Sequence, residues 1–444
     1  MAKITVIGTG YVGSVSGACL ADFGNYVICV DTNAEKIESL KKGIIPIYEP
    51  GLDDVVQRNR VHGRLTFTTD LAAAINDSSI VFIAVGTPPM EDGSADLAYV
   101  EDAARQIGRL IKQYTVIVDK STVPIGTGRK VHAWVKEELV KRNSDIEFDV
   151  VSNPEFLREG TAVYDFTHPD RVVIGSESNR ARGIMKDVYR SLYLNETPFI
   201  ETTLESAEMI KYASNAFLAV KITFINEIAN LCEKTGADIR AVAKAIGKDG
   251  RIGSKFLHPG PGYGCSCFPK DTRALVKIAG DYGEKLNIVE TTIETNEKQK
   301  LRAAKKIETA LGGLSGKTIA ILGLAFKQNT DDMRESPSIT ICEYLARNGA
   351  ELRLYDPAAM NEGKWRLSSI KDSIYFASDE YDCVKGCHAL VIATPWNQFR
   401  NIDLPGINKL MISPYFFDLR NIYNIDDVIS YGFTYFGTGA REQK

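Results

Sequence analysis

The segment KITVIGTGYVG, residues 3–13, decides the first part of the fold. Residues 3–7 have the β-branched pattern of a short strand, and three glycines follow with the spacing G-x-G-x-x-G. Small residues at 14–23 indicate a helix, and a second apolar strand, 26–30, ends in Asp31. A strand, a glycine turn, a helix and a strand ending in an acid together predict a dinucleotide-binding βαβ unit.

Each part of this unit has a chemical reason. Gly8, Gly10 and Gly13 would let backbone N–H groups approach a pyrophosphate at a helix N-terminus. Asp31 would accept hydrogen bonds from the adenosine ribose and repel a 2′-phosphate, which favours NAD over NADP. Lys36 either helps to hold the ribose or is an ordinary solvated helix lysine. The alternative for the whole motif is a tight turn with no ligand.

The same plan recurs later in the chain. The strand and turn at 317–323, the acid-ended strand at 351–356 and the strand at 389–395 repeat 3–8, 26–31 and 80–88. Strands that alternate with helices, such as 79–85, 99–112 and 115–118, imply a parallel sheet covered on both faces. We expect an α/β protein with two doubly wound Rossmann-like domains, 1–200 and 311–444, joined by a central long-helix domain, 201–310.

The middle of the chain is helical. Residues 204–234 contain no proline and no glycine, and apolar residues recur there at helical spacing. A helix of this length spans about 45 Å, and a second helix is expected at 288–308. The excess of apolar surface favours a homodimer or a larger homo-oligomer formed through these helices.

Composition excludes several classes of protein. The 444 residues include 53 Lys+Arg and 57 Asp+Glu, giving a net charge of −4, so a basic nucleic-acid footprint is absent. No apolar run is long enough to span a membrane, and the N-terminus lacks a secretory pattern. Most of the eight cysteines lie in apolar segments, which indicates reduced thiols of a cytoplasmic protein.

The segment FLHPGPGYGCSCFPKD, residues 256–271, is too rich in glycine and proline for regular structure, yet it ends in a helix-start signal. Its backbone amides suit a phosphate or sugar ligand. Cys267 precedes the expected helix, where the helix dipole and Lys270 would activate a thiol, and Asp271 could exchange protons with whatever the thiol attacks. A structural cysteine in a turn is the alternative.

Two further groups carry chemistry. Lys211 and Asn215 share one face of the long helix, where a developing oxyanion would satisfy both; a lysine that reaches solvent is the alternative. The segment NPEFLREG, residues 153–160, follows an apparent strand at 148–151, at the end where parallel sheets bind ligands. A surface salt-bridge cluster would have the same composition.

Together these segments resemble the UDP-glucose/GDP-mannose dehydrogenase family of nucleotide-sugar 6-dehydrogenases. The resemblance runs from Lys3 to about Arg420, and its most specific motifs are SCFPKD (266–271), NPEFLREG (153–160) and DMRESP (332–337). It implies a four-electron oxidation of UDP-glucose at C6 to the carboxylate, with two NAD+ and no metal. Cys267 would be the nucleophile, forming a thiohemiacetal and then a thioester.

The resemblance also implies roles for individual residues. Lys211 and Asn215 would stabilise oxyanions, and Asp271 would act as a base through water ordered by Thr122 and Glu155. The implied cofactor contacts are Gly8, Gly10, Tyr11, Val12, Gly13, Asp31, Lys36, Thr87, Thr122, Glu159, Lys270 and Arg334. The implied substrate contacts are Glu155, Phe156, Leu157, Arg158, Glu159, Lys211, Asn215, Phe256, Leu257, His258, Pro259, Gly260, Gly264 and Lys327, with Arg251 from a neighbouring subunit.

One position departs from the family. Cys265 stands where the family usually has glycine before the Ser-Cys pair. If that position requires a positive φ, a cysteine there costs on the order of 1 kcal/mol. Cys265 could also form a strained disulfide with Cys267 and inactivate the enzyme under oxidation, or it could simply be tolerated.

Rival functions remain at this stage. GDP-mannose and UDP-N-acetylmannosamine 6-dehydrogenases share the cofactor motif and the thiol chemistry. A two-electron β-hydroxyacid dehydrogenase has a similar plan and would have no use for a nucleophilic Cys267. A protein of a different class, an NAD-binding redox sensor, would use Cys265 and Cys267 as its switch and would have no substrate.

Overall fold

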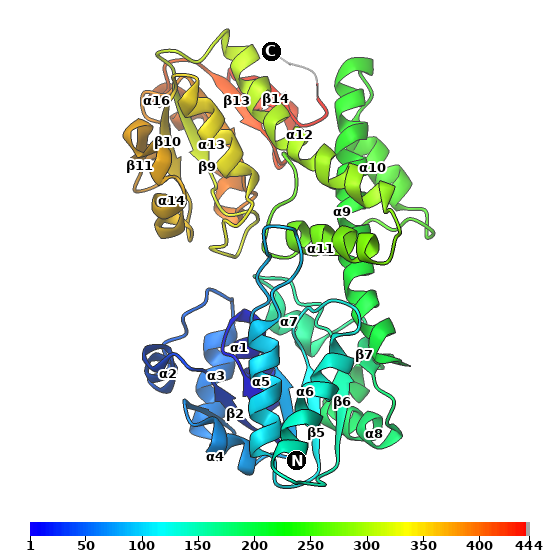
Figure 1. The fold of residues 1–444 in the computed structure, drawn as a ribbon. Helices are drawn as coiled ribbons and strands as arrows, with labels where there is room; N and C mark the ends of the chain where they lie inside the picture. The colour runs from blue at the N-terminus through cyan, green and yellow to red at the C-terminus, as the bar shows by residue number, and fades with distance from the viewer. Residues whose placement is uncertain (441–444) are drawn as a thin grey trace. The chain divides into compact units, whose positions relative to one another are not determined.

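The computed structural model describes residues 1–440. The chain divides into two compact units, one made of Met1–Ser214 with Lys277–Glu284 and the other of Asn215–Val276 with the chain from Lys285 onward. Each unit contains one β-sheet with helices packed on it (Figure 1). The predicted α/β class with two Rossmann-like sheets is confirmed.

The first sheet has eight strands in the order β3-β2-β1-β4-β5-β6-β7-β8. Neighbouring strands are parallel except β6 and β7. Strand order reverses between β1 and β4, which is where open α/β sheets bind ligands. The strands are β1 (Lys3–Ile7), β2 (Tyr26–Val30), β3 (Leu65–Thr68), β4 (Ile80–Ile83), β5 (Thr115–Asp119), β6 (Phe148–Ser152), β7 (Val172–Gly175) and β8 (Phe199–Thr202).

Helices connect these strands. They are α1 (Tyr11–Asp22), α2 (Ala34–Lys41), α3 (Leu52–Val61), α4 (Leu71–Asn76), α5 (Ala98–Leu110), α6 (Thr127–Lys141), α7 (Ala162–Thr167), α8 (Asn179–Val188) and the 3-10 turn η1 (Arg190–Asn195). Helix α1 begins at Tyr11, three residues before the predicted start at 14, because Gly10 serves as its N-cap and Gly13 lies inside its first turn.

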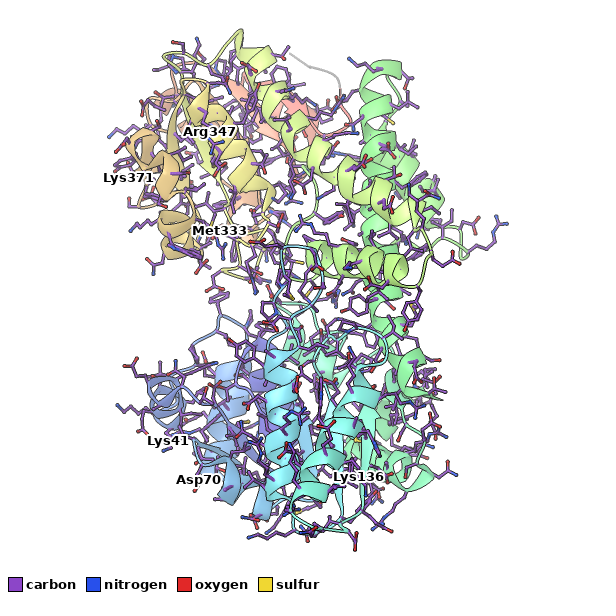
Figure 2. The ribbon with its side chains drawn as sticks, in the orientation of Figure 1. Lys41, Asp70, Lys136, Met333, Arg347 and Lys371 are labelled. Atoms are coloured by element: carbon purple, nitrogen blue, oxygen red, sulfur yellow. The ribbon has the colours of Figure 1, made fainter. Side chains whose placement is uncertain are left out.

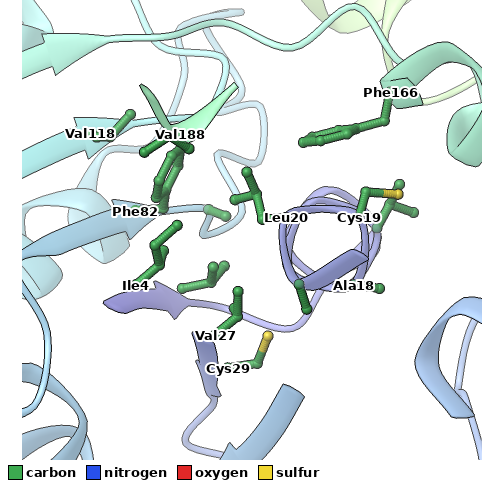
Figure 3. Packing of buried hydrophobic residues seen from close by; sticks show 14 of the residues in the cluster. Ile4, Ala18, Cys19, Leu20, Val27, Cys29, Phe82, Val118, Phe166 and Val188 are labelled. Carbon is green, nitrogen blue, oxygen red and sulfur yellow. The ribbon is translucent and has the colours of Figure 1, made fainter. Parts of the chain in front are cut away.

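Buried apolar side chains join α1 to the sheet (Figure 3). Ile4 of β1, Leu20 of α1 and Val27 of β2 pack in one cluster and are almost fully buried. Cys19 and Cys29 are part of this cluster, and all eight cysteines of the chain are free thiols, seven of them buried. Seven of the eight cysteines are therefore buried, and only Cys267 is partly exposed.

The second sheet has six strands in the order β11-β10-β9-β12-β13-β14, all parallel, which repeats the order of the first six strands of the first sheet. The strands are β9 (Thr318–Leu322), β10 (Glu351–Tyr355), β11 (Ile374–Phe376), β12 (Ala389–Ile392), β13 (Tyr415–Asp418) and β14 (Thr434–Gly437). The connecting helices are α13 (Pro337–Arg347), α14 (Met360–Arg366), α15 (Glu380–Val384), α16 (Leu404–Leu410) and α17 (Ile425–Ser430), with the 3-10 turns η2 (Ser368–Ser373) and η3 (Asn397–Arg400).

The central helices are α9 (Leu204–Thr235), α10 (Ile239–Gly247), α11 (Phe268–Asp281) and α12 (Asn287–Leu311). Within the second unit, Glu233 of α9 pairs with Lys306 at 2.7 Å and with Arg302 at 3.1 Å, which fixes α12 to α9. Helix α12 ends at Leu311, three residues beyond the predicted end at 308, and Gly312 is its left-handed C-cap with φ 65°.

Charged side chains lie at the outside of the units. Figure 2 labels Lys41, Asp70 and Lys136 of the first unit and Arg347 and Lys371 of the second; all five are exposed. Within residues 1–440, no helix is both long and apolar enough to cross a membrane. The three-domain division expected from the sequence stays a prediction.

Candidate active site

The glycine turn at the end of β1 leaves no room for side chains at Gly8 and Gly13. Gly8 has φ +96°, and a Cβ there would lie 2.6 Å from the carbonyl oxygen of Ala84. A Cβ on Gly13 would lie 1.9 Å from the carbonyl oxygen of Gly8, so α1 packs directly on the turn. Gly10 is exposed and has no atom within 4 Å of its Cβ position. The turn therefore presents open backbone at the N-terminus of α1, which fits a dinucleotide pyrophosphate.

Asp31 lies directly after β2, beside this turn. Its Oδ2 accepts hydrogen bonds from the backbone N of Thr9 at 2.9 Å and from Thr9 Oγ1 at 2.7 Å, and Lys36 Nζ lies 3.2 Å away. Burial raises the pKa of Asp31, but the hydrogen bonds from Thr9 and Asn33 and the charge of Lys36 outweigh burial and leave it at about 2. A permanently ionised carboxylate at the strand end is the acceptor that a ribose diol requires.

The other predicted cofactor residues of this unit lie around the same strand ends. Tyr11 and Val12 form the first turn of α1, and the hydroxyl of Thr87, in the loop after β4, donates to the carbonyl oxygen of Thr122 at 2.8 Å. The phenol of Tyr11 donates to Glu49 and contacts the backbone N of Gly160 at 3.2 Å.

Glu49 is a residue that the sequence analysis missed. It is 6% exposed, and its carboxylate accepts hydrogen bonds from the backbone N of Gly160 at 2.5 Å and of Ala162 at 2.6 Å. Together with the Tyr11 phenol, these bonds tie the glycine turn to segment 153–160. No local motif marks this acid, because its partners lie 38 positions away at Tyr11 and more than 100 positions away at Gly160 and Ala162.

Segment 153–160 follows β6 and supplies Glu155. Glu155 Oε1 pairs with Lys211 Nζ at 2.8 Å, and both side chains are almost fully buried. Burial raises the pKa of Glu155, but the charge and hydrogen bond of Lys211 and the N–H of Leu157 lower it below its ordinary value. In this structure Lys211 therefore pairs with a carboxylate, while Phe156 lies with its ring centroid 5.5 Å from the ammonium.

The second half of segment 153–160 forms an ion pair at the surface. Arg158 pairs with Asp165 of α7 at 2.5 Å, and Glu159 is partly buried. The segment thus combines a buried acid with a surface ion pair. Its predicted role in ligand binding stays a prediction.

Within the second unit, Cys267 directly precedes α11, as predicted. Its carbonyl oxygen accepts from the backbone N of Asp271 at 2.8 Å, and its Sγ lies 3.6 Å from Ser266 Oγ. Asp271 is 1% exposed; its Oδ2 accepts from Asn215 Nδ2 at 2.6 Å, and its Oδ1 lies 2.8 Å from Lys270 Nζ. Asn215 and Asp271 thus form a buried pair one helical turn from the thiol.

This pairing refines the sequence analysis. In the structure each residue of the pair contacts an acid, Glu155 for Lys211 and Asp271 for Asn215. The oxyanion that both were expected to stabilise stays a prediction. Both acids are more than 50 positions from their helix partners, so spacing alone could not indicate these pairs.

The glycine-proline loop before Cys267 is hydrogen-bonded to α9 and α12 and packs against the second Rossmann-like domain. The backbone N of Gly260 donates to Asn226 Oδ1 at 2.8 Å, and its carbonyl accepts from Gln299 Nε2 at 3.0 Å. A Cβ on Gly264 would lie 2.5 Å from the carbonyl oxygen of Glu335. Among the predicted substrate residues of this loop, Leu257 and Pro259 are buried, Phe256 is partly buried and His258 is exposed.

Cys265 has φ +85°, so the position has the backbone conformation that favours glycine. Its Sγ accepts a hydrogen bond from the backbone N of Cys267 at 3.2 Å, and burial, reinforced by the Cys267 thiol, raises its pKa. The expected positive φ is confirmed. The predicted redox switch stays a prediction, which Cys265→Gly would test by abolishing any inactivation that peroxide causes and thiols reverse.

Three predicted contacts lie at the edges of the second unit. Arg251 is exposed and pairs with Asp249 at 2.6 Å, and Arg334 pairs with Asp332 at 2.9 Å. Lys327 is partly buried in the loop after β9, with its Nζ 5.4 Å from the ring centroid of Phe326.

Arg420 is a cation that the sequence analysis did not single out. Its Nε donates to the carbonyl oxygen of Ala393 at 2.7 Å, and a Cβ on Gly260 would lie 3.1 Å from its guanidinium. Desolvation lowers the pKa of Arg420 to about 10, against the opposing charge of Asp418, and among residues 1–440 no acid lies within ion-pair distance of its guanidinium. It lies beside the ends of β12 and β13, where this sheet would take an anionic ligand.

Comparison with known proteins assigns a family to each part of the chain. Models of the UDP-glucose/GDP-mannose dehydrogenase family match in three places: the NAD binding domain at 2–193, the central domain at 205–298 and the UDP binding domain at 320–425.

Individual proteins agree with these models. The chain is 52% identical to a UDP-glucose 6-dehydrogenase of Rhizobium meliloti (strain 1021), covering 98% of this chain and 99% of the relative. It is 48% identical to the UDP-glucose 6-dehydrogenase TuaD of Bacillus subtilis (strain 168), covering 99% and 93%. A solved UDP-glucose dehydrogenase from Pyrobaculum islandicum matches with a TM-score of 0.90 at 38% identity, covering 99% of this chain and 98% of that one.

Proposed function

This chain belongs to the UDP-glucose/GDP-mannose dehydrogenase family, and we propose that it oxidises UDP-glucose at C6 to UDP-glucuronate. It is an NAD-dependent oxidoreductase. The observation that carries the proposal is Cys267 at the start of α11, one turn from the buried Asn215–Asp271 pair. A thiol beside a base can hold an aldehyde on the enzyme for a second oxidation.

The first oxidation requires a base and an oxyanion site. Bound NAD+ supplies the hydride acceptor for each of the two oxidations. Lys211 and Asn215 stabilise the alkoxide that develops on the C6 oxygen as hydride leaves C6. Asp271 takes up the hydroxyl proton through a water molecule, which Thr122 and Glu155 order.

The second oxidation requires Cys267. Its thiolate attacks C6 of the aldehyde, a C–S bond forms, and the carbonyl oxygen becomes the oxygen of a thiohemiacetal. This tetrahedral carbon still carries a C–H bond, so a second hydride can leave and a thioester results. Water then attacks the thioester, the C–S bond breaks, and the carboxylate product leaves with Cys267 restored.

We propose that each Rossmann-like domain holds one nucleotide. The first, residues 1–200, binds NAD through Gly8, Gly10, Tyr11, Val12, Gly13, Asp31, Lys36, Thr87, Thr122 and Glu159, with Lys270 and Arg334 completing the site. The second, residues 311–444, binds the UDP moiety, supported by the UDP binding domain model at 320–425. Residues 201–310 and segment 155–159 contact the sugar nucleotide, together with Phe256–Gly260, Gly264, Lys327 and Arg251 of a neighbouring subunit.

We also propose a cytoplasmic homodimer formed through the central helices. On α9, Phe217, Phe224 and Leu231 recur every seven residues and are 65%, 49% and 58% exposed. A stripe with heptad spacing can pack against its own copy about a two-fold axis. Sedimentation at micromolar concentration should give twice the mass of the chain, and Phe224→Glu should give the monomer mass. Free thiols at all eight cysteines support the cytoplasmic placement.

The test is product formation by wild type and Cys267→Ser with UDP-glucose and NAD+. Wild type should form UDP-glucuronate, and the variant should form none while still binding NAD+. Cys232→Ala, which replaces a buried cysteine elsewhere on α9, is the matched control and should keep wild-type turnover. Full turnover of UDP-glucose to the acid by Cys267→Ser would overturn the thiol mechanism.

The same assay separates the rival functions. Preferred turnover of GDP-mannose or UDP-N-acetylmannosamine would change the substrate and keep the thiol chemistry. NAD binding without turnover of any of the three nucleotide sugars would favour a redox sensor.

A further inference from the structure

Lys120 is a buried ammonium that the proposed mechanism does not use. It follows β5, is 5% exposed, and donates from Nζ to Asn153 Oδ1 at 3.0 Å and to the Tyr189 hydroxyl at 3.2 Å. In the described part of the chain no carboxylate forms an ion pair with it. Burying a charge that lacks a directly paired countercharge is costly, so a role for it is expected.

The contacts of Lys120 converge on Asn153. The Tyr189 hydroxyl donates to Asn153 Oδ1 at 2.7 Å, and Asn153 Nδ2 donates to the carbonyl of Val173 at 2.7 Å. The backbone N of Asn153 donates to the carbonyl of Asp119 at 2.9 Å. Asn153 is thereby fixed to β5 and β7 and to the end of α8. Glu155 lies two positions after Asn153 and forms its ion pair with Lys211.

The charges of Lys120, Glu155 and Lys211 also interact. Titratable groups around Lys120 are Glu155 after β6, Lys211 of α9 and Tyr189 after α8. Burial lowers the pKa of Lys120 to about 7, with Lys211 adding to this effect and Glu155 opposing it. Lys120 in turn helps Lys211 to keep the pKa of Glu155 low. Phe166 and Tyr189 place their ring centroids 5.9 and 5.7 Å from the ammonium, which keeps water away from it.

We propose that Lys120 is a positioning residue for the oxidation, holding Asn153 so that Glu155 stays paired with Lys211 and adding a second positive charge to that of Lys211. This inference rests on the proposed roles of Glu155 and Lys211. It assigns to Lys120 an effect on turnover rather than on binding, because its hydrogen bonds go to Asn153 and Tyr189, neither of which is a predicted nucleotide contact.

The test compares Lys120→Met and Lys120→Arg with wild type, using UDP-glucose and NAD+. In Lys120→Met we expect kcat to fall about 10- to 100-fold, with KM for both substrates within about threefold. Loss of the positive charge raises the pKa of Glu155, so the acidic limb of the kcat profile should move to higher pH. Lys120→Arg keeps the charge and the donors and should keep the wild-type limb and at least about a tenth of kcat.

Tyr189→Phe is the matched control, since it removes one hydrogen bond to Asn153 and keeps the ammonium. It should lower kcat only a few-fold and leave the acidic limb in place. Wild-type kcat and an unshifted limb in folded Lys120→Met would overturn the inference. If Lys120→Met does not fold, a shifted acidic limb or a loss of more than about 100-fold in folded Lys120→Arg would overturn it.

Infrared titration of the Glu155 carboxylate, assigned by difference with Glu155→Gln, is independent of turnover. A higher pKa in Lys120→Met supports the inference, and an unchanged pKa overturns it. If wild type does not oxidise UDP-glucose, the proposed function fails, and this titration alone decides the role of Lys120.

Discussion

The two Rossmann-like domains share one strand order and differ in the loop between the first strand and the next helix. In the first, only residues 8–10 separate β1 from α1, and the backbone of Gly8 and Gly13 leaves no room for side chains. In the second, residues 323–336 separate β9 from α13, and no second glycine follows Gly323 in that loop. The first loop offers backbone N–H groups at a helix N-terminus, whereas the second places side chains there.

The acid that follows the second strand of each domain, Asp31 after β2 and Asp356 after β10, also differs between the two domains. Asp31 is partly exposed at the rim of its turn. Asp356 is 1% exposed, and its Oδ2 accepts from the backbone N of Leu324 at 2.7 Å and from Trp396 Nε1 at 3.1 Å. Both acids hold the loop that follows the first strand, Asp31 through Thr9 and Asp356 through Leu324. Asp31 alone of the two stays partly exposed, so we expect it to be the one that contacts a ligand.

Positive charge shows the complementary difference. The first domain places Lys36 against Asp31, whereas Arg420 in the second donates to backbone carbonyls and has no paired acid in the described chain. We therefore expect the first domain to bind a dinucleotide through backbone N–H groups and the second to bind a nucleoside diphosphate through cations.

Among the substitutions that test this difference between the two domains, Gly13→Ala should have the largest effect. The added Cβ would lie 1.9 Å from the Gly8 carbonyl, so α1 must shift from the turn. We expect loss of NAD binding by calorimetry and a lower melting temperature. Gly183→Ala in α8, which meets no atom within 4 Å, is the control and should keep both properties. Unchanged NAD affinity in Gly13→Ala would contradict the role of the turn.

Asn substitutions at the two acids should separate their roles. Asp31→Asn is expected to weaken NAD binding about 10-fold and to reduce discrimination against NADP, because the charge that repels a 2′-phosphate is lost. Asp356→Asn should leave the NAD dissociation constant unchanged and lower the free energy of unfolding by about 1–3 kcal/mol. Equal effects of the two variants on NAD binding would contradict the distinction.

Arg420→Met should raise KM for UDP-glucose by about 10-fold and leave KM for NAD+ within about twofold. The reason is loss of the unpaired cation at the switch point of the second sheet. Lys36→Met removes the corresponding cation of the first domain. It should raise KM for NAD+ by only a few-fold, since Lys36 is paired with Asp31. Steady-state kinetics with each substrate varied measures both, and a rise in KM for NAD+ alone in Arg420→Met would contradict the assignment.

The pH dependence of stability gives the smallest effect. The pKa of Asp31 is about 2 in the folded chain, below its ordinary value. The ionised Asp31 therefore contributes on the order of 1–2 kcal/mol to the free energy of unfolding. This contribution is complete above about pH 4 and is lost as the pH falls toward 2. Chemical unfolding of wild type and Asp31→Asn should be measured at pH 7 and at the lowest pH where both fold. The difference in the free energy of unfolding between the two proteins should be smaller at the lower pH. A difference that grows on acidification would contradict the depressed pKa.

Local patterns in the sequence predicted the parts of this molecule that depend on neighbouring residues. The glycine turn, Asp31 at its strand end and Cys267 before a helix each follow from a few adjacent positions. Glu49, Lys120 and Arg420 were not predicted, because their partners come from distant segments and no spacing marks them. The separate acids of Lys211 and Asn215 were missed for the same reason: a shared helix face does not reveal what packs against it.

The central claim is that one enzyme site carries out two oxidations on one sugar, with Cys267 linking them. The most direct measurement is the number of NADH molecules released per UDP-glucose consumed, with the product identified by mass. We predict two NADH and UDP-glucuronate. One NADH per sugar, with the aldehyde as the released product, would contradict the account.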